Sequence, residues 1–277
     1  EGHAAGRNAR LFLHLELTRQ IPAPHGLKEP TLFRCQLFEL LKGVGSPGTG
    51  PQVFQCPVIE PIVDRLQQLG DLRLQLVQRD KLDAVRLLAG QGVTLIVTVD
   101  CGITAVEEAA LCRELGVDLI VTDHHECKDR LPQAVAVVDP HRKDDGYPHR
   151  DLSGVGVAFK LAAALAGDQE TVLREYADLV CLGTVADVMP LRGENRTFVT
   201  RGLASLRQTR RPGLKSLMAQ SGCTPESLSA GSIGFVLAPR INAAGRMGEA
   251  DRAAELMLCK DAVQARELAR ELCQQNR

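Results

Sequence analysis

The chain has 277 residues, of which 44% are hydrophobic, and its formal net charge is -1. This composition predicts a globular protein, and the balanced charge gives no general attraction to nucleic acid, so any site for a polyanion must be local. No apolar run reaches the roughly 18 residues that a membrane span needs. The nine cysteines form no Cys-x-x-Cys pair, which argues against a zinc ribbon and a secreted disulfide framework. We therefore expect a cytoplasmic protein without a membrane partner.

Residues 1–80 form a divergent, poorly defined N-terminal segment. This segment is rich in proline and glutamine and shows weak periodicity. A glycine-rich stretch over 43–52 predicts a loop, and no Gly-Lys-Ser/Thr follows it, so it is not a phosphate-binding loop. We expect a helix over 58–69 and a short strand over 72–77.

The pattern becomes regular at about residue 81. In chain order, we expect a helix, a strand, a helix and two strands, over residues 81–92, 93–100, 103–116, 117–125 and 134–140. Near-continuous apolar strands between such helices imply parallel strands that are covered on both faces. The predicted fold class is α/β, with a doubly wound, mainly parallel sheet over 81–190. A helical segment follows over 191–277, and its last helix is expected over 251–277.

Acidic residues and histidines stand where two predicted strands end. Asp100 ends the strand over 93–100, and Asp123, His124 and His125 end the next strand. Neighbouring strands lie about 4.8 Å apart, and such sheets bind ligands at the carboxyl ends of their strands. Converging carboxylates and imidazoles favour Mn²⁺ or Mg²⁺ over structural zinc. In the alternative interpretation, the aspartates cap the following helices and the histidines are ordinary loop residues, but the combined spacing favours a metal site.

Five motifs in a fixed order resemble those of a known family. They are VDCG, VTDHHE, LSGVGVAFKL, GTVADVMPL and PRINAAGRMGEA, at residues 99–102, 121–126, 152–161, 183–191 and 239–250. Over residues 81–277 the chain resembles the RecJ branch of the DHH phosphoesterase family, the single-strand-specific 5′ to 3′ DNA exonucleases. The resemblance implies a hydrolase that cleaves single-stranded DNA in DNA repair or recombination.

The resemblance also implies roles for individual residues. Two Mn²⁺ or Mg²⁺ ions would bind close together, with Asp100, His124 and Asp187 among their ligands. His125 would contact the scissile phosphate, and Asp123 would orient the histidines. One ion would lower the pKa of a bound water, and both would stabilise charge during an in-line displacement.

A second set of residues matches the family's phosphate-contacting segment. These residues are Arg240, Asn242 and Arg246. A guanidinium fork suits a phosphodiester, and the alternative is a surface loop or helix cap.

Other candidates carry less weight. Asp139 precedes a proline and is expected to cap its own backbone. Gly154 and Gly156 precede an apolar helix, where close helix packing and backbone contact with a phosphate explain them equally well. Cys101 has no partner at metal spacing.

The chain departs from the family in its N-terminal segment. The family begins with a strand that ends in Asp-x-Asp-x-x-Gly and supplies two aspartates to the metals, and residues 1–99 contain no such motif. Either this segment has diverged, or an altered reading of the gene replaces it. The two-metal site is therefore expected to be incomplete.

The family also continues beyond a helix like the one expected at 251–277. We expect this chain to be a DHH-domain fragment that lacks the C-terminal DNA-gripping and OB domains, and to bind single-stranded DNA weakly because it has few aromatic residues and no net positive charge. One alternative is a DHH phosphodiesterase acting on oligonucleotides or cyclic dinucleotides. Another is a non-catalytic binding or scaffold protein that kept the fold.

Overall fold

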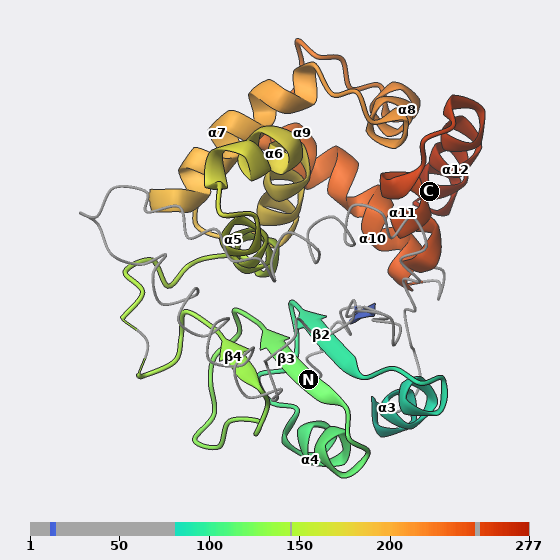
Figure 1. Cartoon of the computed structure of the whole chain (residues 1–277). Coiled ribbons are helices and arrows are strands. Elements are labelled where there is room, and N and C mark those ends of the chain that lie inside the picture. Colours follow the sequence, from blue (N-terminus) through green and yellow to red (C-terminus); the bar gives the residue numbers. More distant parts are fainter. Residues whose placement is uncertain (1–11, 15–80, 145, 247–249, 277) are drawn as a thin grey trace, which may run out of the picture. The chain divides into compact units, whose positions relative to one another are not determined.

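The computed structural model describes residues 12–14, 81–144, 146–246 and 250–276 (Figure 1). The loop, helix and strand predicted within 43–77 lie outside these residues. The described chain divides into two compact units, an α/β unit of residues 12–14 and 81–175 and a helical unit from residue 176 onward. Each unit is described here by itself.

The α/β unit is built on a four-stranded sheet with the order β1-β2-β3-β4. The strands are Phe12–His14, Leu95–Val99, Asp118–Thr122 and Ala136–Val138. β2, β3 and β4 run parallel to one another, whereas β1 runs antiparallel along β2. The predicted α/β fold with a mainly parallel sheet is confirmed.

Helices cover both faces of this sheet (Figure 1). α3 (Lys81–Gly90) and α4 (Val106–Glu114) share a buried apolar cluster with Ile96, Leu119 and Val121. α5 (Gly154–Ala166) packs against the other face, where Val97, Ile120 and Ala136 are buried. The two clusters use alternate residues of each strand, because successive side chains of a strand point to opposite faces.

One helix begins later than its sequence suggests. The periodicity predicts a helix from residue 103, but α4 starts at Val106. Ile103 lies instead in a turn, and its backbone N–H donates to the carboxylate of Asp123 at 2.9 Å. The side chain of Asp123, which directly follows β3, thus satisfies this backbone donor outside the helix.

The helical unit contains most of the remaining helices, and α6 leads into it. The helices are α6 (Gln169–Ala186), α7 (Gly193–Arg207), α8 (Pro212–Ser221), α9 (Ala230–Ser232), the π-helix η1 (Ile233–Leu237), α10 (Ala238–Arg246), α11 (Ala250–Leu258) and α12 (Ala262–Gln275). Their shared core includes Leu206, Leu214, Leu256 and Leu272. The helix predicted over 251–277 is divided in two because the side chain of Asp261 caps α12, accepting from the backbone N–H groups of Val263 and Gln264.

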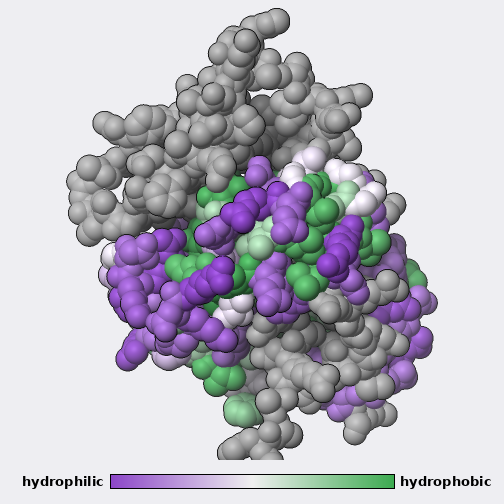
Figure 2. All heavy atoms as spheres, turned by 90° about the horizontal axis from the view of Figure 1, so that it is seen from below, coloured by the Kyte–Doolittle hydropathy of each residue, from purple (hydrophilic) through white to green (hydrophobic). Residues whose placement is uncertain are grey.

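On the face of the molecule drawn in Figure 2, hydrophilic side chains separate small apolar patches. Among the described residues, no helix combines the length and apolar character required to cross a bilayer.

Candidate metal centre

The candidate site begins where β2 and β3 end. The parallel register places Val99 beside Thr122, so the chain leaves both strands at the same edge of the sheet. The turn after β2 is held by the Thr98 hydroxyl, which donates to the Cys101 carbonyl at 2.7 Å. Asp100 and Gly102 adopt left-handed backbone conformations with φ of 62° and 114°. Left-handed residues other than glycine are uncommon, and strained ones cluster at functional sites.

Three side chains converge at this edge. Asp100, His124 and His125 each offer one ligand atom, and these atoms lie within 4.8 Å of one another. His124 Nε2 lies 2.9 Å from Asp100 Oδ1, yet this buried oxygen accepts no hydrogen bond. A carboxylate oxygen and imidazole nitrogens that face one point are the donor set of a divalent transition-metal site, so the residues present fit one Mn²⁺ ion.

Asp123 stabilises the turn that contains His124 and His125. Its side chain is buried, with 1% of the residue exposed. Its carboxylate accepts from the backbone N–H groups of Ile103 and His124 at 2.9 and 2.8 Å and from His125 Nδ1 at 2.6 Å. Burial acts to raise the pKa of this carboxyl, but these hydrogen bonds and the charge of His125 outweigh it, so the pKa is lowered.

The contact with Asp123 selects the tautomer of His125. An ionised carboxylate can only accept, so His125 Nδ1 must carry the proton that it shares with Asp123. In the neutral ring, Nε2 then presents a lone pair. Asp123 therefore acts as a positioning residue, in the way that outer carboxylates orient metal-binding histidines.

The start of α5 closes the site on another side. A Cβ atom added to Gly154 would lie 2.2 Å from Asp100 Oδ1, so this helix approaches the carboxylate too closely for any side chain. Ser153 caps the helix and accepts from the backbone N–H of Gly156 at 3.2 Å. Of the two explanations left open for these glycines, close packing holds at Gly154, and its contact is with the candidate metal ligand.

Asp139 follows β4 and is fully buried, with 0% of the residue exposed. Its Oδ1 accepts from the backbone N–H of His141 at 2.8 Å, which confirms the predicted cap. Its Oδ2 is buried without a hydrogen-bond partner. Burial raises the pKa of this carboxyl above its ordinary value, and the nearby charge of Asp123 raises it further.

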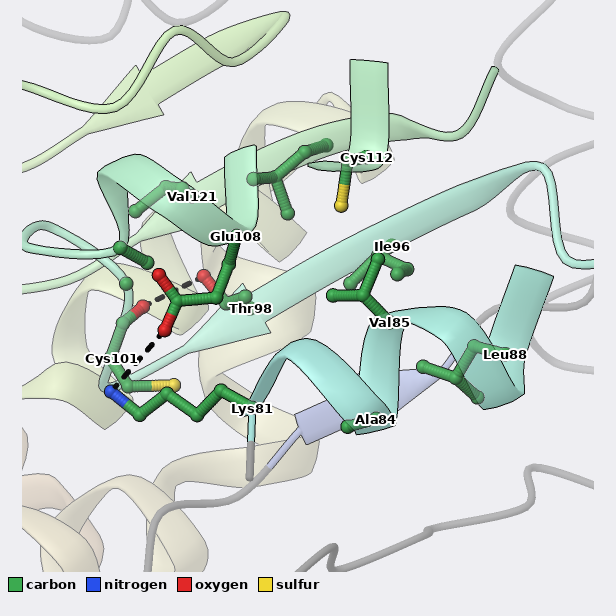
Figure 3. A pocket seen from close by; sticks show the side chains of 13 residues that line it. Lys81, Ala84, Val85, Leu88, Ile96, Thr98, Cys101, Glu108, Cys112 and Val121 are labelled. Carbon is green, nitrogen blue, oxygen red and sulfur yellow. Dashed lines mark hydrogen bonds and ion pairs between the residues drawn. The ribbon is translucent and has the colours of Figure 1, made fainter. Parts of the chain in front are cut away.

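A small pocket lies beside Cys101 and is lined by residues of α3, α4 and the sheet (Figure 3). Its volume is about 30 Å³, room for about two water molecules. Apolar residues of α3, α4 and the sheet line it together with Cys101, and Lys81 Nζ lies 4.0 Å from a Glu108 carboxylate oxygen at its edge. Because the pocket is mainly apolar, the converging ligand atoms mark the candidate site and the pocket does not.

One family matches the segment that holds these features, which are the ends of β2 and β3, the Asp-His-His turn and the glycine beside Asp100. The model of the DHH family, N-terminal domain, matches residues 16–184. The chain belongs to the DHH family.

Two curated relatives of this DHH-family chain share one description. The single-stranded-DNA-specific exonuclease RecJ of Bacillus subtilis is 47% identical over 194 residues, which cover 70% of this chain and 24% of that protein. The RecJ protein of Escherichia coli is 42% identical over 195 residues, covering 66% of this chain and 34% of that protein. The chain thus spans about a quarter to a third of the length of these relatives.

Solved structures agree with this assignment. A crystal structure of exonuclease RecJ bound to manganese matches with a TM-score of 0.60 and 40% identity, covering 69% of this chain and 49% of that chain. RecJ from Thermus thermophilus in complex with Mn²⁺ matches with a TM-score of 0.65 and 33% identity, covering 88% of this chain and 36% of that chain.

The other predicted site residues of this DHH-family chain lie in the helical unit. Asp187 is exposed and directly follows α6, with its backbone N–H donating to the Gly183 carbonyl at 3.0 Å. Arg240 and Asn242 lie on α10, and Asn242 is exposed. Arg246 ends the same helix, and its side chain lies outside the description. The roles of these residues relative to Asp100 stay predictions.

Sequence reasoning did not place His125 among the ligand atoms. Alternation along a strand would send residues 124 and 125 to opposite faces. β3 ends at Thr122, however, so both histidines lie in a turn, with ring centroids 4.5 Å apart. The signal available in the sequence was the run of polar residues that ends the strand before the histidines.

Proposed function

We propose that this chain carries the catalytic DHH part of a single-stranded-DNA exonuclease that hydrolyses phosphodiesters in the 5′ to 3′ direction with Mn²⁺ or Mg²⁺. The convergence of Asp100, His124 and His125 at the edge of the sheet carries this proposal. The relatives named above and their manganese-bound structures support it. The alternatives are a DHH phosphodiesterase acting on oligonucleotides or cyclic dinucleotides and a non-catalytic remnant of the fold.

The metal would be held by Asp100 and His124, with Asp187 as a further ligand. When bound, a divalent ion of this kind supplies an activated water and stabilises negative charge on the phosphate. His125 offers a ring nitrogen within 4.8 Å of the other two ligand atoms and is placed to contact either the ion or a phosphate oxygen. The contact with Asp123 keeps the proton of the neutral His125 ring on Nδ1.

The substrate strand would be held by the helical unit. Arg240, Asn242 and Arg246 are proposed to contact its phosphates, because guanidinium and amide groups donate to phosphate oxygens. We also propose that the chain divides into a core over 81–190 and a helical part over 191–277. We propose a role in DNA repair or recombination and a cytoplasmic location. Further domains of the same protein are proposed as partners in DNA binding.

Calorimetric titration of Mn²⁺ into the purified chain tests the metal site. We expect wild type to bind the ion and Asp100→Asn with His124→Ala to lose binding by at least tenfold. The matched control is Asp118→Asn, because Asp118 is exposed at the opposite end of β3 from the histidines. Equal binding by all three proteins would contradict the proposed site.

Cleavage of 5′-labelled single-stranded DNA by the same proteins tests the reaction. Activity in wild type and in the Asp118→Asn control, lost in the double variant, is the expected result. Metal binding without cleavage of DNA, oligonucleotides or cyclic dinucleotides would instead identify a non-catalytic relative.

A further inference from the structure

An exposed aromatic ring stands out in the helical unit. Phe235 is 86% exposed, whereas Phe159 and Phe198 are 3% and 2% exposed. Exposing a phenylalanine forgoes the favourable free energy of its burial, about 1.5–3 kcal/mol. A ring held this far into solvent is therefore a candidate for contact with another molecule.

The backbone around Phe235 explains why the ring points outward. It occupies the middle of the π-helix η1, in which the Ala238 N–H donates to the Ile233 carbonyl. Ile233 and Leu237 at the two ends of η1 are completely buried and anchor the turn. π-helical turns are rare and occur frequently at functional sites.

The same turn lies next to the end of α6. A Cβ atom at Gly234 would be 3.6 Å from Val185 Cγ1, so the backbone beside Phe235 packs on the residue two positions before Asp187. Val188, directly after Asp187, is 87% exposed and has a φ of 56°. A candidate metal ligand and an exposed ring are thus brought close together within one unit.

Two polar side chains follow Phe235 along the chain, in α10. Arg240 Nη1 donates to the Val236 carbonyl at 2.6 Å, which fixes the guanidinium against the residue that follows Phe235. Asn242 is exposed one half-turn further along α10. An exposed aromatic ring and two side chains able to donate hydrogen bonds thus lie on the consecutive segments η1 and α10.

We propose that Phe235 is a stacking platform for a nucleobase of the single-stranded substrate, with Arg240 and Asn242 beside the adjoining phosphate. Aromatic side chains next to cationic groups are how proteins hold single strands without reading sequence. This inference deepens the proposed function and rests on it for the identity of the strand. A protein segment as occupant would need a broad apolar face, but Ile233 and Leu237, on either side of Phe235 in the chain, are completely buried.

Binding to oligonucleotides with and without bases tests the stacking site. Anisotropy of a fluorescent 12-nucleotide oligothymidylate would be measured with the whole chain, alongside an abasic strand of equal length and charge. Phe235→Leu is expected to weaken binding of the thymidylate by roughly 5- to 150-fold and of the abasic strand by less than twofold. Phe235→Trp should restore binding of the thymidylate.

Controls separate this result from failure of the hydrolysis. Leu258→Ala alters another exposed apolar residue, 58% exposed, and should leave both affinities unchanged. Manganese-dependent hydrolysis of the abasic strand, which has no base to stack, should be equal in wild type and Phe235→Leu. A base-dependent loss of binding in a chain that hydrolyses nothing would uphold the stacking site and overturn the proposed activity. Equal losses on the two strands, no loss, or no binding of thymidylate by wild type would overturn the stacking site.

Discussion

The two units of this chain support their candidate site residues in different ways. In the α/β unit, Asp123 and His124 are almost wholly buried, at 1% and 7% exposure, whereas the side chains of Asp100 and His125 are about half exposed. In the helical unit, Asp187 and Asn242 are exposed, and so is Phe235. Buried polar groups need every partner in place, so the metal centre is coupled to the stability of its unit. Exposed groups carry no such coupling, and the helical unit is free to vary its surface without unfolding.

The largest expected effect comes from Asp123→Asn. The new amide would retain one acceptor but turn an N–H₂ group toward the N–H of Ile103 or His125, and the negative charge would be lost. We expect the free energy of unfolding to fall by about 3 kcal/mol, the cost of breaking buried hydrogen bonds to a charged group. Mn²⁺ affinity should fall at least tenfold, because His125 loses its orientation. Urea unfolding and calorimetry measure the two effects, and a variant with wild-type stability would break the comparison.

The loss of stability in Asp123→Asn should depend on pH, because the pKa of the Asp123 carboxyl is lowered in the folded protein. Its value in the folded protein lies below the ordinary 3.8, so the stabilisation is fully present above pH 3.8 and is lost as the pH falls through the folded-state pKa. The difference in unfolding free energy between wild type and Asp123→Asn should therefore shrink in acid. Urea titrations at pH 7, 4 and 3 would reveal this trend, and a constant difference would contradict it.

A buried charge without a role in the site provides the contrast. Asp178 is 3% exposed, and it accepts from Arg211 Nε at 3.2 Å and from the Thr209 hydroxyl at 2.9 Å. Arg211→Met would leave the carboxylate buried with fewer donors and should cost about 2 kcal/mol of unfolding free energy. Mn²⁺ affinity, measured by calorimetry, should stay within twofold of wild type. A tenfold loss of affinity would show that the helical unit also couples stability to the metal site.

A smaller loss of stability with a clear loss of metal is expected for Gly154→Ala. The added methyl would overlap Asp100 Oδ1, so either α5 or the carboxylate must move, at a cost of about 1–2 kcal/mol. We expect Mn²⁺ affinity to fall at least tenfold. Gly90→Ala is the matched control, because nothing lies within 4 Å of a Cβ there. Unchanged metal binding in Gly154→Ala would show that Asp100 tolerates displacement.

The metal centre was readable from sequence because strand ends are set by local pattern. The apolar runs that became β2 and β3 place Asp100 and His124 at one edge in any parallel pairing. The contact between Gly154 and Asp100 was not readable, because residues more than fifty positions apart meet only through the packing of α5. The cap by Asp139 was predicted from its own turn, but its complete burial depends on the neighbouring strand.

The helical unit was predicted less fully for a physical reason. Its helices follow from periodicity, yet the π-turn at Phe235 is one residue wider than an α-turn, and nothing in IGFVL distinguishes the two. The break between α11 and α12 depends on the Asp261 cap, which overrides a continuous helical pattern. The exposure of Phe235 and the left-handed backbone of Val188 appear only after tertiary packing.

The smallest expected effect tests that strain directly. Val188 is β-branched, has a φ of 56° and is 87% exposed, so its left-handed backbone is unfavourable and its side chain gains little from burial. Val188→Asn should raise the free energy of unfolding by about 1 kcal/mol, because asparagine tolerates this conformation. Val263→Asn is the control, since Val263 is also exposed, at 56%, but lies in α12. If Val188→Asn is stabilising and cleavage of single-stranded DNA nevertheless slows, the strain beside Asp187 serves the site. If Val188→Asn is not stabilising, this backbone carries no strain. The contrast between a coupled metal centre and a freely variable helical surface then becomes sharper.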